Sequence, residues 1–215
     1  MQIQISRLVP VPLKDVLLKR NSDVWNKDLI FDQQQWIKIK APSGTGKTTL
    51  IHLIYKLRQD YQGQISIENK DLRSISGDEL ATLRQSRISI IFQDLRLFEN
   101  LTARENIELN RVLQTPYYPP EKIDAMSARI RIAHILDQRA GLCSYGEQQR
   151  IAIIRALMQP FEVLLMDEPF SHLDNENTAL AAALIAEECT TRGAGFVLTD
   201  LDEDNNFNYT HYLNL

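Results

Sequence analysis

Eight residues in the first quarter of the chain have the types and spacing that bind a phosphate chain. Residues 41–48, APSGTGKT, bring two glycines, a lysine and a hydroxyl side chain together. Gly44 and Gly46 allow backbone N–H groups to curl around phosphate oxygens without a steric clash. Lys47 supplies a positive charge to the β- and γ-phosphates, and Thr48 offers its hydroxyl to Mg²⁺. The predicted nucleotide-binding residues are Ser43, Gly44, Thr45, Gly46, Lys47, Thr48 and Thr49.

The sequence around this loop predicts the elements that hold it. Residues 36–39 are typical of a strand and residues 49–58 of a helix, which is the strand–loop–helix setting of a P-loop. A glycine–lysine string of this kind arises by chance about once in a hundred chains of this length. A solvated loop is therefore the weaker interpretation.

Three residues near the loop are unusual. Ala41 stands where such motifs usually begin with glycine. Alanine is tolerated there if its φ is negative, and it destabilises the loop by about 1 kcal/mol if φ is positive. Lys38 and Lys40 lie in a strand that should be buried on both faces, so we expect one face of that strand to be partly open.

A second chemical group lies 120 residues later, where the apolar run 163–166 ends in Asp167 and Glu168. Successive strand residues point in opposite directions, so the two carboxylates have different tasks. Asp167 suits the shell of Mg²⁺, and Glu168 suits polarisation of the attacking water. An apolar run before Asp-Glu is a weak signal alone, but it is strong as the partner of a P-loop.

Composition limits the possible classes of protein. The 215 residues contain 44% hydrophobic and 24% charged residues, with a net charge of −4. This length fits one domain, and the acidic balance argues against a nucleic-acid partner. No run approaches the roughly 18 apolar residues that cross a bilayer, and Cys143 and Cys189 give neither a disulfide framework nor metal spacing. We expect a cytoplasmic protein that reaches a membrane only through a partner.

The pattern of apolar runs predicts an α/β fold. Residues 88–92, 163–166 and 196–198 are typical of buried parallel strands, and the alanine-rich segment 177–189 is a crossover helix. Shorter β-type runs, which predict an antiparallel N-terminal region, are residues 1–5, 16–18, 29–31, 36–39 and 65–67. Residues 115–122, with three prolines, separate elements. A helical stripe of Ile123, Met126, Ile130, Ala133 and Leu136 follows.

These elements predict one domain with an inserted helical subdomain. We assign residues 1–99 and 150–215 to a nucleotide-binding core, and residues from about 100 to 149 to the insertion. The core is expected to be a P-loop NTPase fold with a mixed or parallel sheet between helices.

With these motifs placed, the chain resembles the ATP-binding cassette (ABC) proteins over nearly its whole length. Residues 143–150, CSYGEQQR, are similar to the family signature L-S-G-G-[EQ]-Q-Q-R and precede a helix-like segment, 151–158. Residues 91–94, IFQD, resemble the Q-loop, and residues 171–174, SHLD, resemble the D-loop. The resemblance implies ATP and Mg²⁺ as cofactors, Gln93 as a further Mg²⁺ ligand and catalytic residue, and Lys47 and Glu168 as catalytic residues.

The signature segment implies a homodimer with ATP sandwiched between two subunits. Ser144, Gly146 and Glu147 lie at the start of a helix, where an anion is favoured. In the family this end faces the nucleotide of the other subunit. The resemblance also implies a membrane permease partner, and therefore a location at the cytoplasmic side of a membrane.

Residues 95–109 resemble cassettes of the lipoprotein-release, macrolide-export and cell-division branch. Leu95, Leu97 and Phe98 follow the Q-loop, where the family receives the coupling helix of the permease. An exposed apolar patch fits partner binding, while local core packing is an equal alternative.

Four departures from the family pattern concern the nucleotide site. Cys143 and Tyr145 replace the usual leucine and first glycine of the signature, and Asp200 stands at the position of the switch histidine. A carboxylate cannot donate a hydrogen bond to a γ-phosphate at neutral pH. Residues 7–13 offer only aliphatic side chains where an aromatic residue normally stacks on adenine. The segment before Cys143 and the end of the chain are also short.

The departures lead to two functional hypotheses. The first is a transporter ATPase subunit with slow turnover, because loss of the switch histidine removes roughly 4 kcal/mol of transition-state stabilisation. The alternative is an ATP-gated regulatory module with little or no hydrolysis. A soluble cassette of DNA repair or translation fits less well.

The remaining chemical candidates are weaker. His52 and His134 suit core or surface roles, and His172 in the D-loop contacts either the other subunit or solvent. The acidic run 200–204 is typical of a solvated turn.

Overall fold

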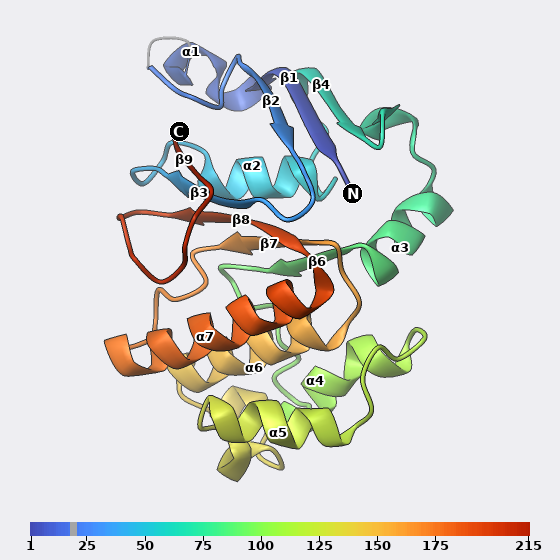
Figure 1. Cartoon of the computed structure of the whole chain (residues 1–215), viewed down its shortest axis with the longest axis vertical. Coiled ribbons are helices and arrows are strands. Elements are labelled where there is room, and N and C mark those ends of the chain that lie inside the picture. Colours follow the sequence, from blue (N-terminus) through green and yellow to red (C-terminus); the bar gives the residue numbers. More distant parts are fainter. Residues whose placement is uncertain (18–20) are drawn as a thin grey trace.

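Two β-sheets form the framework of the chain (Figure 1), which is described here by a computed structural model covering residues 1–17 and 21–215. A five-stranded parallel sheet has the order β6-β7-β8-β3-β9, and a four-stranded antiparallel sheet has the order β2-β1-β4-β5. The parallel strands are β3 (Trp36–Lys40), β6 (Ile88–Ile91), β7 (Val163–Asp167), β8 (Gly195–Asp200) and β9 (His211–Asn214). The antiparallel strands are β1 (Ile3–Pro10), β2 (Asp28–Phe31), β4 (Tyr61–Ile67) and β5 (Lys70–Asp71).

Helices cover both faces of the parallel sheet. Helix α2 (Lys47–Ile54) lies between the two sheets, whereas α6 (Tyr145–Met158) and α7 (Asn175–Arg192) pack on the opposite face of the parallel sheet (Figure 1). All five residues of β7 are buried, as expected for a strand covered on both sides. The predicted α/β fold with an antiparallel N-terminal region is confirmed.

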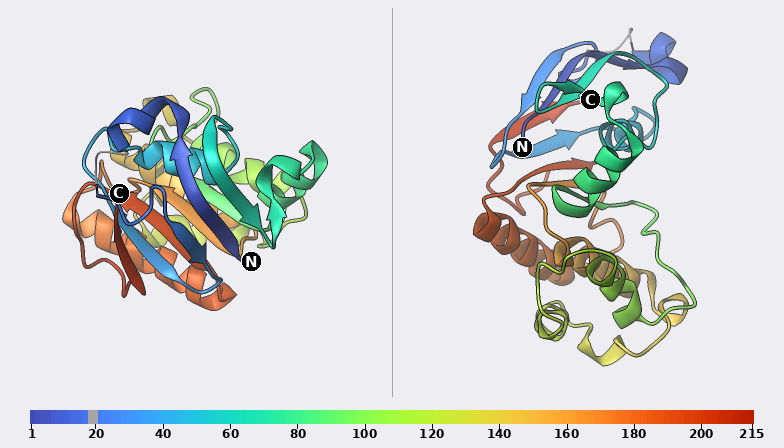
Figure 2. Two further views of the ribbon diagram at one scale, coloured as in Figure 1. Left: turned by 90° about the horizontal axis from the view of Figure 1, so that it is seen from above. Right: turned by 90° about the vertical axis from the view of Figure 1, so that its right-hand side faces the viewer.

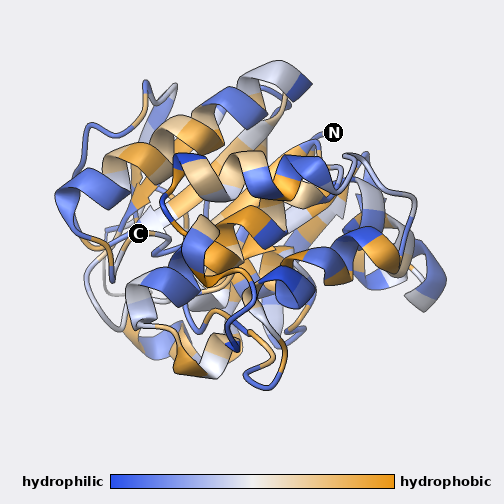
Figure 3. Ribbon diagram, turned by 90° about the horizontal axis from the view of Figure 1, so that it is seen from below, coloured by the Kyte–Doolittle hydropathy of each residue, from blue (hydrophilic) through white to orange (hydrophobic). Residues whose placement is uncertain are grey.

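Four further α-helices lie around this framework. They are α1 (Lys14–Leu17), α3 (Gly77–Ser86), which contacts the edge strand β6, α4 (Ala103–Val112) and α5 (Glu121–Arg129). Helices α4 and α5 lie beyond α6, at the end of the molecule away from the antiparallel sheet (Figure 1; Figure 2, right). Apolar residues concentrate in the interior strands and helices, whereas the outer loops mix hydrophilic and hydrophobic residues (Figure 3).

Two expected elements differ in the structure. Val16 and Leu17 are helical rather than extended, because a single turn after Pro12 buries Leu17 and leaves Val16 exposed; residue 18 lies outside the described residues. The apolar stripe 123–136 is buried except at Ala133. Helix α5 ends at Arg129, and Arg131 has a positive φ of 59°. The helical period therefore stops before Ala133.

A buried ion-pair cluster holds α5 and the preceding loop against α7. The Glu188 carboxylate accepts a hydrogen bond from the Tyr118 hydroxyl at 2.7 Å and pairs with Lys122 at 3.1 Å. Arg192 completes the cluster at 2.9 Å from Glu188. Glu188 and Arg192 are both nearly inaccessible to solvent, so the pairing compensates the cost of burying the charges.

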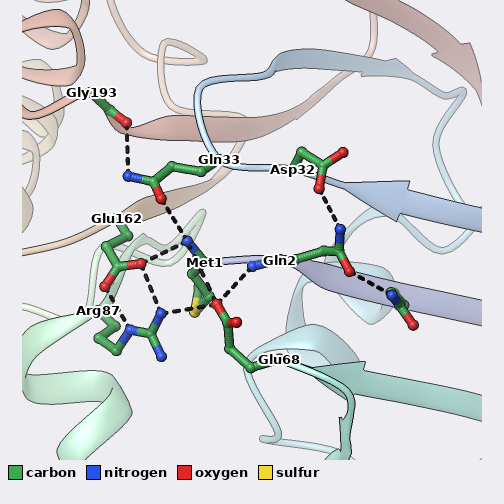
Figure 4. A network of polar contacts seen from close by, with 9 residues as sticks. Met1, Gln2, Asp32, Gln33, Glu68, Arg87, Glu162 and Gly193 are labelled. Atoms are coloured by element: carbon green, nitrogen blue, oxygen red, sulfur yellow. Dashed lines mark hydrogen bonds and ion pairs between the residues drawn. The ribbon is translucent and has the colours of Figure 1, made fainter.

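A polar network joins the antiparallel sheet to the parallel sheet (Figure 4). The Arg87 guanidinium donates to Glu162 at 2.6 Å and to Glu68 at 3.0 Å. The α-amino group of Met1 lies 2.7 Å from Glu162. The hydrogen bond from Arg87 lowers the pKa of Glu162 to about 2, with a further contribution from the Met1 amino group.

This network predicts a loss of stability in acid. A carboxylate with a lowered pKa stabilises the fold above its unfolded pKa, near 4.5, and loses that contribution as pH falls towards 2. Because the carboxylate is partly exposed, we expect about 1 to 2 kcal/mol rather than the full shift. Urea unfolding at pH 5 and pH 3 should show a smaller pH effect in Glu162→Gln than in the wild type. Equal pH dependence in the two proteins would contradict this role.

Candidate functional site

The loop between β3 and α2 curls at its two glycines. Gly44 has a φ of 77° and Gly46, which caps the start of α2, has a φ of 100°. A pocket of about 280 Å³ lies beside the loop. It is lined by Leu13, Ser43, Gly44, Gly46, Lys47, Thr48, Thr49, Gln93 and Glu168. The N-terminus of α2 and the loop amides thus face a pocket of the kind that binds anions.

Buried contacts beneath the loop hold it in this shape. Thr45 does not line the pocket; its hydroxyl donates to the Pro42 carbonyl at 2.7 Å. The buried Trp25 donates its indole N–H to the Thr45 carbonyl at 3.2 Å. A Cβ at Gly46 would lie 3.0 Å from the Trp25 ring. The role of Trp25 could not be predicted from the sequence, because a lone tryptophan 16 positions before the first loop residue does not indicate this contact.

Ala41 fits the position where the motif usually has glycine. It does not have a positive φ, so alanine is tolerated there at little cost. Its N–H donates to the Asp200 carbonyl at 2.9 Å. The end of β8 therefore fixes the first residue of the loop.

A chain of polar contacts joins the loop to the predicted catalytic residues. Lys47 lies 3.2 Å from Glu168 Oε1 and donates to the Ala41 carbonyl at 2.9 Å. Gln93 Nε2 donates to Glu168 Oε2 at 3.0 Å, and the Thr48 hydroxyl donates to Gln93 Oε1 at 3.2 Å. Residues that are far apart in the sequence thus meet at one end of the pocket.

Asp167 and Glu168 leave β7 in different directions. Asp167 is buried and accepts a hydrogen bond at 2.8 Å from the hydroxyl of Thr199 on β8. Glu168 has a φ of 46°, a left-handed conformation that is unfavourable for a residue with a Cβ by about 1 to 2 kcal/mol. This turn directs its carboxylate to Lys47 and Gln93, so the two acids occupy separate positions as expected from their spacing.

The oxygen atoms around this end of the pocket suit a magnesium ion. Asp167 Oδ2 is buried and lacks a hydrogen-bond partner among the described residues. It joins the Thr48 hydroxyl and the Gln93 amide oxygen as candidate ligands. Within residues 1–17 and 21–215 there is no cluster of three His, Cys, Asp or Glu side chains that could hold a metal. A cation here would need phosphate oxygens to complete its shell, which is typical of Mg²⁺ in nucleotide sites.

The signature segment begins helix α6. Ser144 is the N-cap, its hydroxyl accepts from the Glu147 N–H, and Glu147 Oε2 accepts from the Ser144 N–H at 2.8 Å. Burial raises the pKa of Glu147, but the hydrogen bonds from Ser144 outweigh it and the net shift is downwards. A Cβ at Gly146 would lie 3.0 Å from the His172 carbonyl oxygen. Glycine is thus required for the close approach of the D-loop.

Tyr145 packs on the D-loop of the same chain. Its side chain is 47% exposed, and its ring lies edge-on to the His172 ring with centroids 4.1 Å apart. A second cavity of about 320 Å³ lies beside this pair. Its lining residues are Thr48, His52, Gln93, Asp94, Tyr145 and His172.

Asp200 is turned away from the pocket. Its carboxylate lies 3.4 Å from Lys38 Nζ, and Lys38 is also paired with Asp204. The Tyr209 hydroxyl donates to Asp204 at 2.6 Å. Burial raises the pKa of Asp204, but the hydrogen bonds from Lys38 and Tyr209 give a net lowering. The expectation of an open strand face is wrong at Lys38, which is fully buried among these partners, whereas Lys40 is partly exposed beside Glu203.

The segment after the Q-loop is only partly exposed. Leu95 is buried and Leu97 packs against the core, whereas Phe98 is 59% exposed. Arg155 fixes the turn by donating to the carbonyls of Leu95 and Arg96 at 2.6 and 2.7 Å. Local packing explains Leu95, and Phe98 remains an exposed apolar side chain.

The site combines a glycine loop at a helix N-terminus with an acidic pair at the end of β7, and candidate oxygen ligands lie between them. This combination defines a P-loop nucleotide-binding protein. Comparison with known proteins gives the particular family. The family model described as ABC transporter matches residues 25–171. The chain belongs to the ABC transporter family.

Several curated relatives are similar to the chain. The uncharacterized ABC transporter ATP-binding protein YvcR of Bacillus subtilis is 32% identical over 81% of the chain and 68% of its own length. The phosphonates import ATP-binding protein PhnC 1 of Rhodopseudomonas palustris is 35% identical over 74% of the chain, which spans only 60% of that relative. The macrolide export protein MacB of Marinobacter nauticus is 30% identical, and the chain spans 27% of its length.

A solved structure has the same fold. The dimeric structure of MJ0796, a bacterial ABC transporter cassette, aligns with a TM-score of 0.76 over 93% of this chain and 88% of that chain, at 24% identity. A second structure of MJ0796, in a post-hydrolysis state bound to ADP and Pi, aligns equally well. The predicted P-loop NTPase fold of the cassette proteins is therefore confirmed.

Proposed function

We propose that the chain is the ATP-binding subunit of an ABC transporter, which binds Mg-ATP at the interface of a homodimer and couples ATP hydrolysis to a membrane permease. The observation that carries this proposal is the continuous contact path from Thr48 through Gln93 and Glu168 to Lys47 at the end of the P-loop pocket. Family membership and the ATP-binding relatives support it.

Each residue of the site has a role that follows from its position. The Lys47 ammonium group and the amides of the loop residues that line the pocket bind the triphosphate. These residues are Ser43, Gly44, Gly46, Lys47, Thr48 and Thr49. Thr48, Gln93 and Asp167 would hold Mg²⁺, which would supply positive charge to neutralise the phosphates. Glu168, released from Lys47 when phosphate takes its place, accepts a proton from the attacking water.

The adenine site is expected to be weak. Leu13 lines the pocket beside the loop, and it offers aliphatic surface where an aromatic ring would stack. The nearby Trp25 is buried beneath Gly46. Affinity should therefore depend mainly on the phosphates and Mg²⁺.

The partner surfaces follow from the same proposal. Ser144, Gly146 and Glu147 at the start of α6 would face the nucleotide of the second subunit. Residues from about 100 to 149 would move as a helical subdomain on a core of residues 1–99 and 150–215, with the exposed Phe98 near the permease contact. None of the helices in the described part of the chain is sufficiently long and apolar to span a bilayer, so attachment to the cytoplasmic side of a membrane would depend on the permease.

A regulatory module without hydrolysis is the weaker candidate. It was motivated by Asp200 and Tyr145, but neither residue lines the P-loop pocket. Lys47, Gln93, Asp167 and Glu168 are all retained at the end of the pocket.

Replacing Lys47 with alanine should test nucleotide binding directly. Loss of a charge-assisted contact of about 2 to 3 kcal/mol is expected to weaken Mg-ATP affinity by about 30- to 150-fold. Calorimetric titration of the wild type, Lys47→Ala and the surface control Lys70→Ala measures the effect. Lys70 pairs with Glu79 at the surface, so its affinity should equal that of the wild type. Equal affinity of Lys47→Ala and the wild type would refute the site.

A further inference from the structure

Two histidines lie beside the nucleotide pocket. Of the four in the chain, His52 and His172 line the second cavity with Thr48 and Gln93. His134 is 70% exposed near Glu147, and His211 is exposed on the outermost strand, β9. The two cavities share Thr48 and Gln93, so the histidine-lined cavity continues from the end where the terminal phosphate would lie.

An additional hydrogen-bond donor would stabilise a terminal phosphate at this end of the site. Lys47 approaches from the loop side, while Glu168, Asp94 and Asp167 place negative charge around the remaining sides. Asp200 neither donates nor faces the pocket, because Lys38 holds its carboxylate elsewhere. A terminal phosphate is stabilised when donors surround its oxygens, and an imidazole can supply one.

His172 is better placed for this task than His52. The His52 ring lies edge-on to Phe92 with centroids 6.2 Å apart, on a helix that cannot move relative to Thr48. Burial, with a contribution from Arg96, also lowers the pKa of His52. His172 is exposed on the D-loop, and its ring contacts the ring of Tyr145.

We propose that His172, oriented by the ring of Tyr145, donates a hydrogen bond to the terminal phosphate of ATP bound in the P-loop of the same chain. This inference rests on the proposed nucleotide-binding function. Tyr145 is a positioning residue, since it contacts His172 rather than the phosphate. Two departures from the family pattern, at the signature segment and at Asp200, are thereby linked: the tyrosine supports an imidazole that enters the site from a different loop.

The preference for ATP over ADP tests the proposal without requiring turnover. In a Glu168→Gln background, the affinities for Mg-ATP and Mg-ADP are measured by calorimetry. Adding His172→Ala should lower the ratio of ATP to ADP affinity about tenfold while leaving ADP affinity within about twofold, because only the terminal phosphate loses a contact. His172→Asn keeps a donor and should recover part of the ratio. Tyr145→Ala should lower the ratio about threefold, and less when His172 is already alanine.

Controls separate this inference from the proposed function. His211→Ala removes an exposed imidazole remote from the pocket and should leave both affinities unchanged. If the Glu168→Gln protein binds ATP and His172→Ala leaves the ratio unchanged, His172 does not contact the phosphate. If His52→Ala lowers the ratio of ATP to ADP affinity and His172→Ala does not, His52 rather than His172 contacts the terminal phosphate. If the Glu168→Gln protein binds neither nucleotide, the proposed function itself fails.

Discussion

Replacing Glu168 with glutamine is expected to lower the rate of ATP hydrolysis by about 10²- to 10³-fold while preserving Mg-ATP binding. Removal of a general base typically has an effect of this size. Glu168 is directed to its place by a left-handed backbone, which fixes its carboxylate between Lys47 and Gln93. Glutamine has nearly the same shape, so the loop and the Gln93 contact should persist.

The charge change gives this prediction a second readout. Glu168 lies 3.2 Å from Lys47 and its negative charge opposes a phosphate at the same place. Removing the charge should therefore leave ATP affinity equal to that of the wild type or tighter. Phosphate release measures the rate, and calorimetry measures the affinity.

Rapid hydrolysis by both the wild type and Glu168→Gln would show that another group activates the water. Very slow hydrolysis by both proteins would favour the regulatory alternative. Asp60→Asn is a suitable control, because Asp60 is exposed, pairs with Arg58 and lines neither cavity.

Replacing Lys38 with methionine is expected to lower the free energy of unfolding by about 3 kcal/mol. The side chain of Lys38 is fully buried, and it neutralises both Asp200 and Asp204. Removing one partner of a buried ion pair leaves uncompensated charge in a low-dielectric environment. Urea unfolding at neutral pH measures the change.

The chain offers a matched control two residues away on the same strand. Lys40 pairs with Glu203 at 2.9 Å, but both side chains are exposed. Lys40→Met should therefore change stability by less than about 1 kcal/mol. Adding Asp204→Asn and Asp200→Asn to Lys38→Met should recover much of the loss. Equal effects of the two lysine substitutions would argue against the buried cluster.

Much of the site could be predicted because its parts are local in the sequence. The loop from Ser43 to Thr49 needs only its own glycines and the helix that follows. The apolar run before Asp167 predicts a buried strand, and alternation along a strand predicts separate positions for the two acids. In the structure Glu168 lies beyond the end of β7, and a left-handed backbone turn sets its direction. Parallel strands bring these segments to one edge of the sheet, which follows from the α/β pattern.

Other contacts could not be predicted because they join distant segments. Lys38 and Asp204 are 166 positions apart, and a lysine in an apolar strand indicates an open face unless its partners are known. The packing of Trp25 under Gly46 likewise depends on how the two sheets are stacked. The helical spacing of apolar residues continues to Ala133 in the sequence, but helix α5 ends at Arg129.

The order of strands in the parallel sheet determines when a nascent chain can first bind nucleotide. Strand β3, which carries the P-loop, is separated from β7, which carries the acidic pair, by β8. A nascent chain that ends before residue 195 therefore holds both halves of the site without the strand that brings them into register. Synthesis proceeds at about 5 to 20 residues per second. The ribosome therefore completes most of the chain before bound nucleotide can stabilise the fold. Nucleotide affinity should thus report the last stage of folding.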